Sequence, residues 1–277
     1  MLTKKTIGFL GAGNLAEALI KGLIGSGSVK AGQILASDRM SERLIHLAEG
    51  YEIKVFSKNF ETVRNADIIF LTVKPNDVTG VLKEIAADFT QGKLLISVAA
   101  GVTTSMILET LKEAGLSHFV PVVRAMPNTP AIVAKGATGI CAGIGTGARQ
   151  MELARALFEP IGQVEIVEDE SMMDAVTGLS GSGPAYVFLF IEALIEGGVK
   201  AGLHRDIAKR LAMQTVAGAA ALAMQSPKDL EELRRMVSSP GGTTIEGLKK
   251  LDEGHFRETI VAAVEAATRR ARDLSGR

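Results

Sequence analysis

A glycine-rich segment near the start of the chain limits its fold more than any other feature. Residues 7–16 read IGFLGAGNLA, a short apolar run followed by G-x-G-x-x-A at the start of a helical pattern. Here Gly11 permits a tight turn, Gly13 lets the backbone approach a pyrophosphate, and Ala16 lets a helix pack closely on a strand. The segment predicts a dinucleotide-binding strand, turn and helix, although a glycine turn without a ligand is the alternative. The cofactor contacts expected in it are Gly11, Ala12, Gly13, Asn14 and Leu15.

Short apolar runs alternate with helical patterns over the first half of the chain. Several runs are continuous and rich in β-branched residues, as expected for parallel strands covered on both faces. The pattern predicts an α/β fold of the Rossmann type, a doubly wound and mainly parallel sheet, over residues 1–168. We expect strands at 7–10, 34–36, 68–73, 94–98, 120–125 and 164–167, a hairpin-like segment at 136–147, and helices at 14–24 and 148–158.

From residue 169 the composition shifts to Ala, Leu, Met and Val at helical spacing, which predicts an all-helical domain over residues 169–277. Its helices lack strong polar stripes, so they need a partner surface. We therefore expect a homodimer through this domain, and a larger ring of dimers is left open. The expected helices are 171–179, 184–201, 205–224, 227–237, 244–252 and 255–274, with Pro184 and Pro227 in first turns.

The composition excludes several classes of protein. The 277 residues carry 31 basic and 31 acidic side chains without a basic block, so a nucleic-acid partner is not expected. Cys141 is the single cysteine, and the four histidines lack metal-ligand spacing, so neither a disulfide nor a metal site is expected. The uncharged segments 175–191 and 211–227 are not expected to cross a membrane, and we predict a cytoplasmic protein.

Two charged residues follow the predicted strand at 34–36. Asp38 is placed to bind a ribose 2′-hydroxyl, as in NAD enzymes, whereas Arg39 is placed to bind a 2′-phosphate. The pair favours NADPH and leaves NADH open; a solvated turn is the alternative.

The loops after two later strands are also expected at the cofactor, because an open α/β sheet binds its ligand at the carboxyl ends of its strands. Lys74 is a candidate base or phosphate contact, although a surface charge is the simpler reading. The residues concerned are Val73, Lys74, Pro75, Ala99, Ala100 and Gly101.

Two motifs in the helical half look like helix N-termini, namely GLSGSGPAY at 178–186 and SSPGGTTIEG at 238–247. Such turns present free backbone N–H groups beside hydroxyls and would hold a small carboxylate without an arginine. A helix–helix turn with a hydroxyl cap is the alternative.

Together, GAGNLA at 11–16, VKP at 73–75, AAG at 99–101, GLSGSGPAY at 178–186 and SPGGTT at 239–244 resemble the pyrroline-5-carboxylate reductase family over nearly the whole chain. The first motif is common among dinucleotide enzymes, whereas the last two, in this order and separation, are specific to the family. The resemblance implies NAD(P)H-dependent reduction of the C=N bond of 1-pyrroline-5-carboxylate to L-proline, the last step of proline biosynthesis.

The resemblance also implies roles for individual residues. It assigns Thr244 to the ring nitrogen as the catalytic contact, Glu170 to the substrate pocket and Asn59 to the cofactor. Met236 stands where relatives carry asparagine, which leaves a polar cofactor contact at that point open. The substrate carboxylate is assigned to Ser239, Gly242 and Thr243.

Two other functions fit parts of the pattern. A β-hydroxyacid dehydrogenase needs a lysine on the helix after its second glycine loop, but the first lysine after Gly183 is Lys200, roughly 25 Å further at ~1.5 Å per residue. A nucleotide-sensing module would bind the cofactor without turnover, and it would not need the second anion site at 238–247.

Overall fold

The computed structural model describes residue 2 and residues 4–276. The chain forms two compact units, one of residues up to Ser182 together with those from Ala266 onward, and one of Gly183–Glu265. A domain boundary between residues 168 and 169 stays a prediction.

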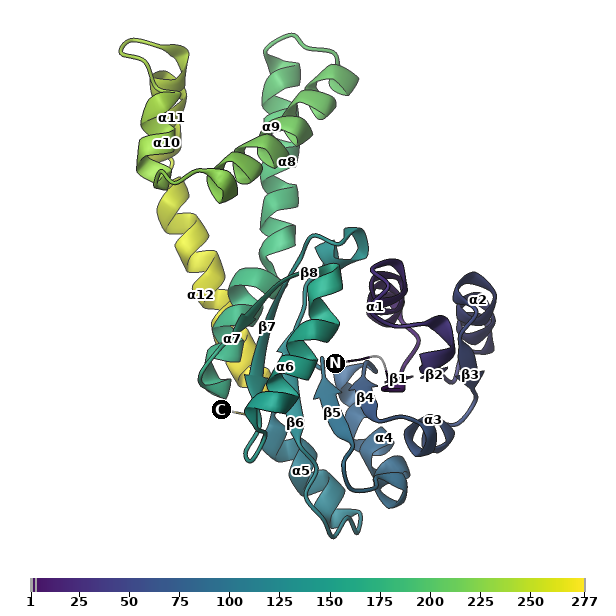
Figure 1. Cartoon of the computed structure of the whole chain (residues 1–277). Coiled ribbons are helices and arrows are strands. Elements are labelled where there is room, and N and C mark those ends of the chain that lie inside the picture. Colours follow the sequence, from purple (N-terminus) through teal and green to yellow (C-terminus); the bar gives the residue numbers. More distant parts are fainter. Residues whose placement is uncertain (1, 3, 277) are drawn as a thin grey trace. The chain divides into compact units, whose positions relative to one another are not determined.

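The first unit is built on one sheet with the strand order β3-β2-β1-β4-β5-β6-β7-β8 (Figure 1). Only the β6–β7 pair is antiparallel among the pairs in the described residues, so the predicted mainly parallel Rossmann-type sheet is confirmed. The strands are β1 Ile7–Leu10, β2 Ile34–Ser37, β3 Lys54–Phe56, β4 Ile68–Leu71, β5 Leu94–Ser97, β6 Val122–Met126, β7 Gly136–Ala142 and β8 Gly162–Ile166.

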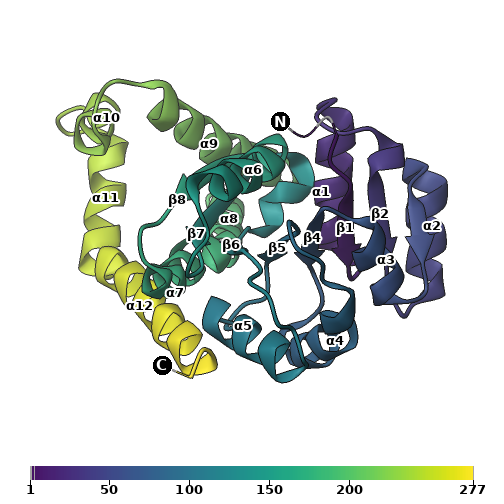
Figure 2. The same ribbon diagram turned by 60° about the horizontal axis from the view of Figure 1, so that its bottom comes forward.

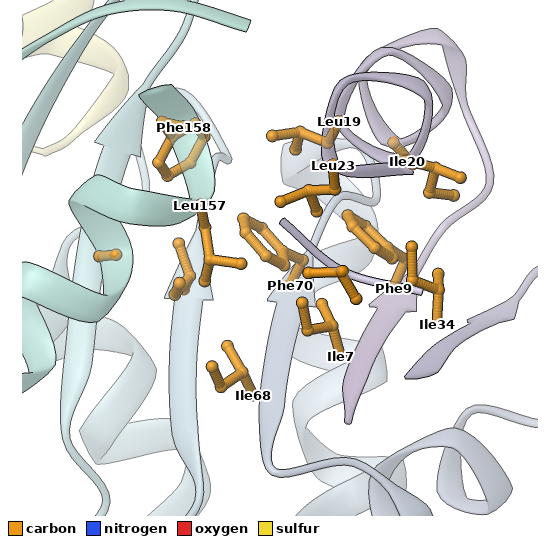
Figure 3. Close-up of a cluster of buried hydrophobic side chains, with 14 of the residues drawn as sticks. Ile7, Phe9, Leu19, Ile20, Leu23, Ile34, Ile68, Phe70, Leu157 and Phe158 are labelled. Carbon is orange, nitrogen blue, oxygen red and sulfur yellow. The ribbon is translucent and has the colours of Figure 1, made fainter. Parts of the chain in front are cut away.

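Helices cover both faces of this sheet, and the strand side chains alternate between two apolar cores. On β4, Ile68 and Phe70 join the core under α1 and α6, whereas Ile69 and Leu71 join the core under α4 and α5. Figure 3 shows the first core, in which the ring of Phe70 stacks on Phe9 with centroids 4.8 Å apart. Figure 2 shows α4 and α5 side by side. The helices are α1 Asn14–Gly25, α2 Ser41–Tyr51, α3 Asn59–Asn65, α4 Val78–Ile85, α5 Thr104–Glu113, α6 Ala148–Phe158 and α7 Met173–Val176.

The second unit is helical, as expected. Helix α12 begins in this unit and ends in the first. Large apolar side chains stay exposed, among them Phe188 at 57% and Leu189 at 67%. By length and composition alone, one helical run in the described residues, Glu170–Lys200, could cross a membrane, and only 6% of its most apolar window is buried. The helices are α8 Gly183–Lys200, α9 Arg205–Gln225, α10 Leu230–Met236, α11 Thr243–Glu253 and α12 Phe256–Leu274.

The helix start predicted at Pro227 was wrong, whereas the start predicted at Pro184 is confirmed within one residue by α8, which begins at Gly183. Helix α10 begins after Pro227, at Leu230, because Asp229 and Glu232 form a capping box there. At 178–186 the expected free N–H groups are partly used: a π-helical turn, Thr177–Gly181, runs into α8, and the Ser182 N–H donates to the Thr177 carbonyl at 2.9 Å. The glycines here mark a change of helix type.

Candidate functional site

The glycine-rich turn between β1 and α1 has the shape of a pyrophosphate cradle. Gly11 has φ +104°, and a Cβ there would lie 2.9 Å from backbone atoms of Thr72 and Val73, so the position requires glycine. Gly13 is the N-cap of α1, and nothing lies within 4 Å of where its Cβ would be. The N-terminus of a twelve-residue helix thus faces open space, which fits a bound pyrophosphate.

The sheet brings the other predicted cofactor residues to the same edge. Leu10 is in register with Ser37 and Leu71, and Leu71 is in register with Ser97, so four parallel strands end together. The loops that carry residues 38–39, 73–75 and 99–101 follow these ends. Asn59 lies beside them, because its Oδ1 accepts from the Ser37 hydroxyl at 2.9 Å.

Asp38 and Arg39 differ in their surroundings. Asp38 accepts the Ala12 N–H at 2.7 Å through Oδ2 and the Met40 N–H at 2.8 Å through Oδ1. The Arg39 side chain is 80% exposed, and its Nη2 lies 3.5 Å from Asp77 Oδ2. Asp38 is therefore bonded to backbone, whereas Arg39 is accessible.

The structure adds two residues that the sequence did not single out for this turn. The Thr72 hydroxyl donates to the carbonyls of Leu10 at 2.9 Å and Gly11 at 2.7 Å. Arg43 Nε donates to the Ala12 carbonyl at 2.9 Å. Thr72 was adjacent to a motif already noted, but Arg43 had no signal beyond its place four residues after Arg39, in the first turn of α2.

The two strand-end loops hold their residues differently. Lys74 is exposed at the N-cap of a short 3₁₀ turn that begins with Pro75, whereas Ala99 is 4% exposed. Gly101 has φ +73°, and a Cβ there would lie 3.1 Å from Leu274 at the end of α12. Gly101 is thus required for close packing of the last helix on this loop.

Glu170 lies in a largely buried ionic cluster of the first unit. Its two oxygens accept the Thr104 N–H at 2.8 Å and the Thr104 hydroxyl at 2.7 Å, at the start of α5. Arg124, 3% exposed, donates to Glu170 at 3.2 Å and lies 3.9 Å from Asp174. The Ser275 hydroxyl donates to Asp174 at 3.2 Å. The carboxylate of Glu170 therefore caps a helix and pairs with a buried arginine.

In the second unit, residues 238–244 form a turn followed by α11. The Gly242 N–H donates to the Ser239 carbonyl at 2.9 Å, and Gly242 is the N-cap of the helix without a side-chain cap. In the described part of the chain, the hydroxyls of Ser239, Thr243 and Thr244 have no hydrogen-bond partner. The turn thus gathers uncommitted hydroxyls and the first N–H groups of an eleven-residue helix, which suits a small anion.

The described residues give little support to a cysteine nucleophile or to a metal site. Burial raises the pKa of the Cys141 thiol to about 12, so it is a poor nucleophile. Within residues 2 and 4–276, no group of His, Cys, Asp or Glu side chains could hold a metal ion.

Comparison with known proteins shows the relationship of the chain. A family model described as pyrroline-5-carboxylate reductase dimerisation matches residues 170–274, and one described as NADP oxidoreductase, coenzyme F420-dependent, matches residues 6–101. The chain is 40% identical to a pyrroline-5-carboxylate reductase of Arabidopsis thaliana over 269 residues, 97% of this chain and 95% of the relative. It is 41% identical to that of Pseudomonas aeruginosa, over 97% of this chain and 96% of the relative.

Solved structures agree. A pyrroline-5-carboxylate reductase from Coxiella burnetii is 38% identical, with a TM-score of 0.91 over 98% of each chain. A pyrroline carboxylate reductase from Plasmodium falciparum with NADP bound is 31% identical, with a TM-score of 0.86 over 98% of each chain. A 3-hydroxyisobutyrate dehydrogenase from Mycobacterium tuberculosis, covering 81% of this chain and 72% of its own, reaches a TM-score of 0.51 at 16% identity, which shows a likeness of fold alone. The chain therefore belongs to the pyrroline-5-carboxylate reductase family.

Proposed function

We propose that this protein reduces the C=N bond of 1-pyrroline-5-carboxylate with NADPH and forms L-proline, as the last step of proline biosynthesis. The observation that carries the proposal is the pair of anion sites in one chain of this family. One is the open helix N-terminus at Gly13, and the other is the uncapped helix N-terminus at Gly242 with its free hydroxyls.

When bound, the dinucleotide supplies the hydride. Residues 11–15 hold its pyrophosphate through the first N–H groups of α1, and the loops at 73–75 and 99–101 flank it at the same edge of the sheet. Arg39 is exposed and free to bind a 2′-phosphate, which favours NADPH, with NADH as the weaker donor. The NADP-bound relative from Plasmodium falciparum is consistent with this preference.

The turn at 238–244 holds the substrate. The hydroxyls of Ser239 and Thr243 and the N–H groups at the start of α11 bind the carboxylate, and the Thr244 hydroxyl binds the ring nitrogen. A cyclic imine binds already protonated, so the chain has to orient the ring and exclude water, and it needs no strong acid. Glu170 and Asn59 keep their proposed places in the substrate pocket and at the cofactor.

The helical half supports a homodimer. Its match to a dimerisation family and its exposed apolar side chains on α8 and α9 indicate a surface that a second copy covers. We propose that the dimer completes each active site in the cytoplasm, since hydride transfer requires the cofactor held at residues 11–15 to reach the substrate held at residues 238–244. Activity should fall on dilution below the dimer dissociation constant, and a fully active monomer in sedimentation would contradict the dimer requirement.

One assay tests the activity. Purified protein is mixed with 1-pyrroline-5-carboxylate and either NADPH or NADH, and cofactor oxidation and proline formation are followed together. We expect oxidised cofactor and proline to form in equal amounts, and kcat/KM to be higher with NADPH than with NADH. Turnover of a β-hydroxyacid instead would favour a dehydrogenase, and cofactor binding without any turnover would favour a sensing module.

A further inference from the structure

The two peptide groups that flank Ala12 in the glycine-rich turn are each held by a charged side chain. The Ala12 N–H donates to Asp38 Oδ2 at 2.7 Å, and the Ala12 carbonyl accepts from Arg43 Nε at 2.9 Å. Ala12 itself is fully buried. These bonds join residues 26 and 31 positions apart, so the conformation of the turn depends on the segment that follows β2.

The turn needs such support because of its composition. Gly11 and Gly13, on either side of Ala12, lack the Cβ that restricts other residues, and glycine loses the most conformational freedom on folding. The two peptide planes that flank Ala12 each adjoin a glycine and rotate easily, and their rotation changes the direction of the neighbouring N–H groups that would face a pyrophosphate. Asp38 on the N–H of the first plane and Arg43 on the C=O of the second fix these rotations, and hydrogen bonds to charged groups are the stronger class.

Asp38 is committed to this support through both of its oxygens. Oδ1 accepts the Met40 N–H at 2.8 Å, while Oδ2 holds Ala12. One lone pair on each carboxylate oxygen is already used by a backbone N–H at short distance, so a ribose 2′-hydroxyl would have to add a third hydrogen bond to a side chain that these two bonds hold in place.

Arg43 is held in place by a second acidic residue. Its Nη2 donates to Glu17 Oε2 at 2.7 Å, and Glu17 Oε1 lies 2.7 Å from His46 Nε2 and accepts from the Tyr51 hydroxyl at 3.1 Å. Burial acts to raise the pKa of Glu17, but the bonds from His46, Arg43 and Tyr51 outweigh it and lower the pKa to about 2. Glu17 is therefore ionised at neutral pH and orients the guanidinium toward Ala12.

We propose that Asp38 and Arg43 are positioning residues, which hold the two peptide groups flanking Ala12 in the shape that binds the dinucleotide pyrophosphate, and that Asp38 does not select the cofactor by binding its ribose. The binding of NADPH and the binding of NADH then depend on Asp38 to the same extent, and discrimination between the two cofactors rests on Arg39. The inference uses one part of the proposed function, namely that the chain binds a nicotinamide dinucleotide.

The test is direct titration of the full-length protein with NADPH and with NADH, without imine. The variants are Asp38→Ala, Asp38→Asn and Arg43→Met, with Glu42→Ala as the matched control because it removes an exposed carboxylate on the same helix as Arg43. We expect Asp38→Ala and Arg43→Met each to raise both dissociation constants about tenfold, the effect of losing one charge-assisted hydrogen bond. Asp38→Asn should recover part of the affinity, since its amide oxygen still accepts the Ala12 N–H, and Glu42→Ala should leave both constants unchanged.

Two further readouts separate positioning from general stability. Hydrogen exchange of the turn at 11–15 in the free protein should be faster in Asp38→Ala and Arg43→Met and unchanged in Glu42→Ala. The double variant should lose less affinity than the two single losses combined, because the two residues hold adjacent peptide groups of the same turn. If Asp38→Ala does not fold, Asp38→Asn and Arg43→Met carry the same comparison.

The proposal is overturned if Asp38→Ala raises the dissociation constant of NADH but leaves that of NADPH unchanged, since that pattern belongs to a ribose-binding carboxylate. It is also overturned if Arg43→Met binds both cofactors as tightly as the unmodified protein. A protein that binds both cofactors but reduces no 1-pyrroline-5-carboxylate would contradict the proposed function and leave these two residues' role intact.

Discussion

The cradle at residues 11–15 and the turn at 238–244 are both helix N-termini suited to anions, but they are held in different ways. The cradle is fixed by its own unit, through Thr72, Asp38 and Arg43 around buried Ala12. The turn at 238–244 has a hydrogen bond from Gly242 to Ser239, while Ser239 and Thr243 are exposed. The first site is organised before its ligand arrives, and the second is expected to gain its order from the substrate and from a second copy of the chain.

The largest effect should come from the most crowded position of the cradle. Gly11→Ala forces a Cβ to within 2.9 Å of the backbone at Thr72 and Val73 and keeps φ +104°. We expect NADPH affinity to fall about a hundredfold or more and stability to fall by about 2–4 kcal/mol, measured by titration and denaturant unfolding.

The control lies in the other region. Gly241 also has a left-handed φ, +70°, but nothing lies within 4 Å of its Cβ position. Gly241→Ala should cost only about 1 kcal/mol of stability. Equal losses of stability in Gly11→Ala and Gly241→Ala would contradict the contrast between a crowded turn and an open turn.

The next largest effect is expected in the turn at 238–244, where a substitution should slow hydride transfer without changing cofactor binding. Thr244→Val keeps the branched shape and removes the hydroxyl that we place on the ring nitrogen. We expect kcat to fall by roughly ten- to a thousandfold, or ~1.4–4 kcal/mol, with NADPH affinity unchanged.

Stability should change little in this variant, because the Thr244 hydroxyl has no partner within the described part of the chain. A Thr244→Val protein with normal kcat would reduce Thr244 to a helix-start residue and move imine orientation to the rest of the turn.

The contrast also explains what the sequence could predict. The local residue pattern was enough to predict two segments, namely the strand, turn and helix at 7–25 and the helix Ala148–Phe158. Their structure depends mainly on residues that are neighbours in the sequence. The strand Lys54–Phe56 was missed because it has three residues and none is fully buried, so it has no apolar run.

The partners of charged side chains could not be predicted in the same way. Asp38 was expected at a ribose and is bonded to Ala12, 26 residues away, and Glu170 is bonded to Thr104, 66 residues away. A carboxylate accepts from whichever donor the fold brings near, and spacing in the sequence does not carry that information. For the uncommitted hydroxyls at 239–244, the role that the family motif implies stays a prediction, and no other group in the described residues competes for them.

A smaller effect should separate the two roles of Glu170. Glu170→Gln leaves an amide oxygen for Thr104 but removes the charge that faces Arg124, which is 3% exposed. We expect stability to fall by about 1–3 kcal/mol in denaturant unfolding. As Glu170 is also proposed for the substrate pocket, KM for the imine should rise while NADPH affinity stays constant. An unchanged KM together with lower stability would make Glu170 a structural residue only.

The smallest effect is expected for Arg39, on the exposed side of the cradle, because only cofactor binding should depend on this side chain. Arg39 is 80% exposed and its contact with Asp77 is long, 3.5 Å, so Arg39→Ala should leave stability within about 0.5 kcal/mol. If its guanidinium binds the 2′-phosphate, KM for NADPH should rise about tenfold while KM for NADH, which lacks that phosphate, stays the same.

Asp77→Ala is the matched control, because it removes the partner of Arg39 without removing the guanidinium. It should leave NADPH binding equal or slightly tighter. Equal losses for the two cofactors in Arg39→Ala would mean that this side chain supports the cradle as Asp38 does, and the preference for NADPH would then need another residue.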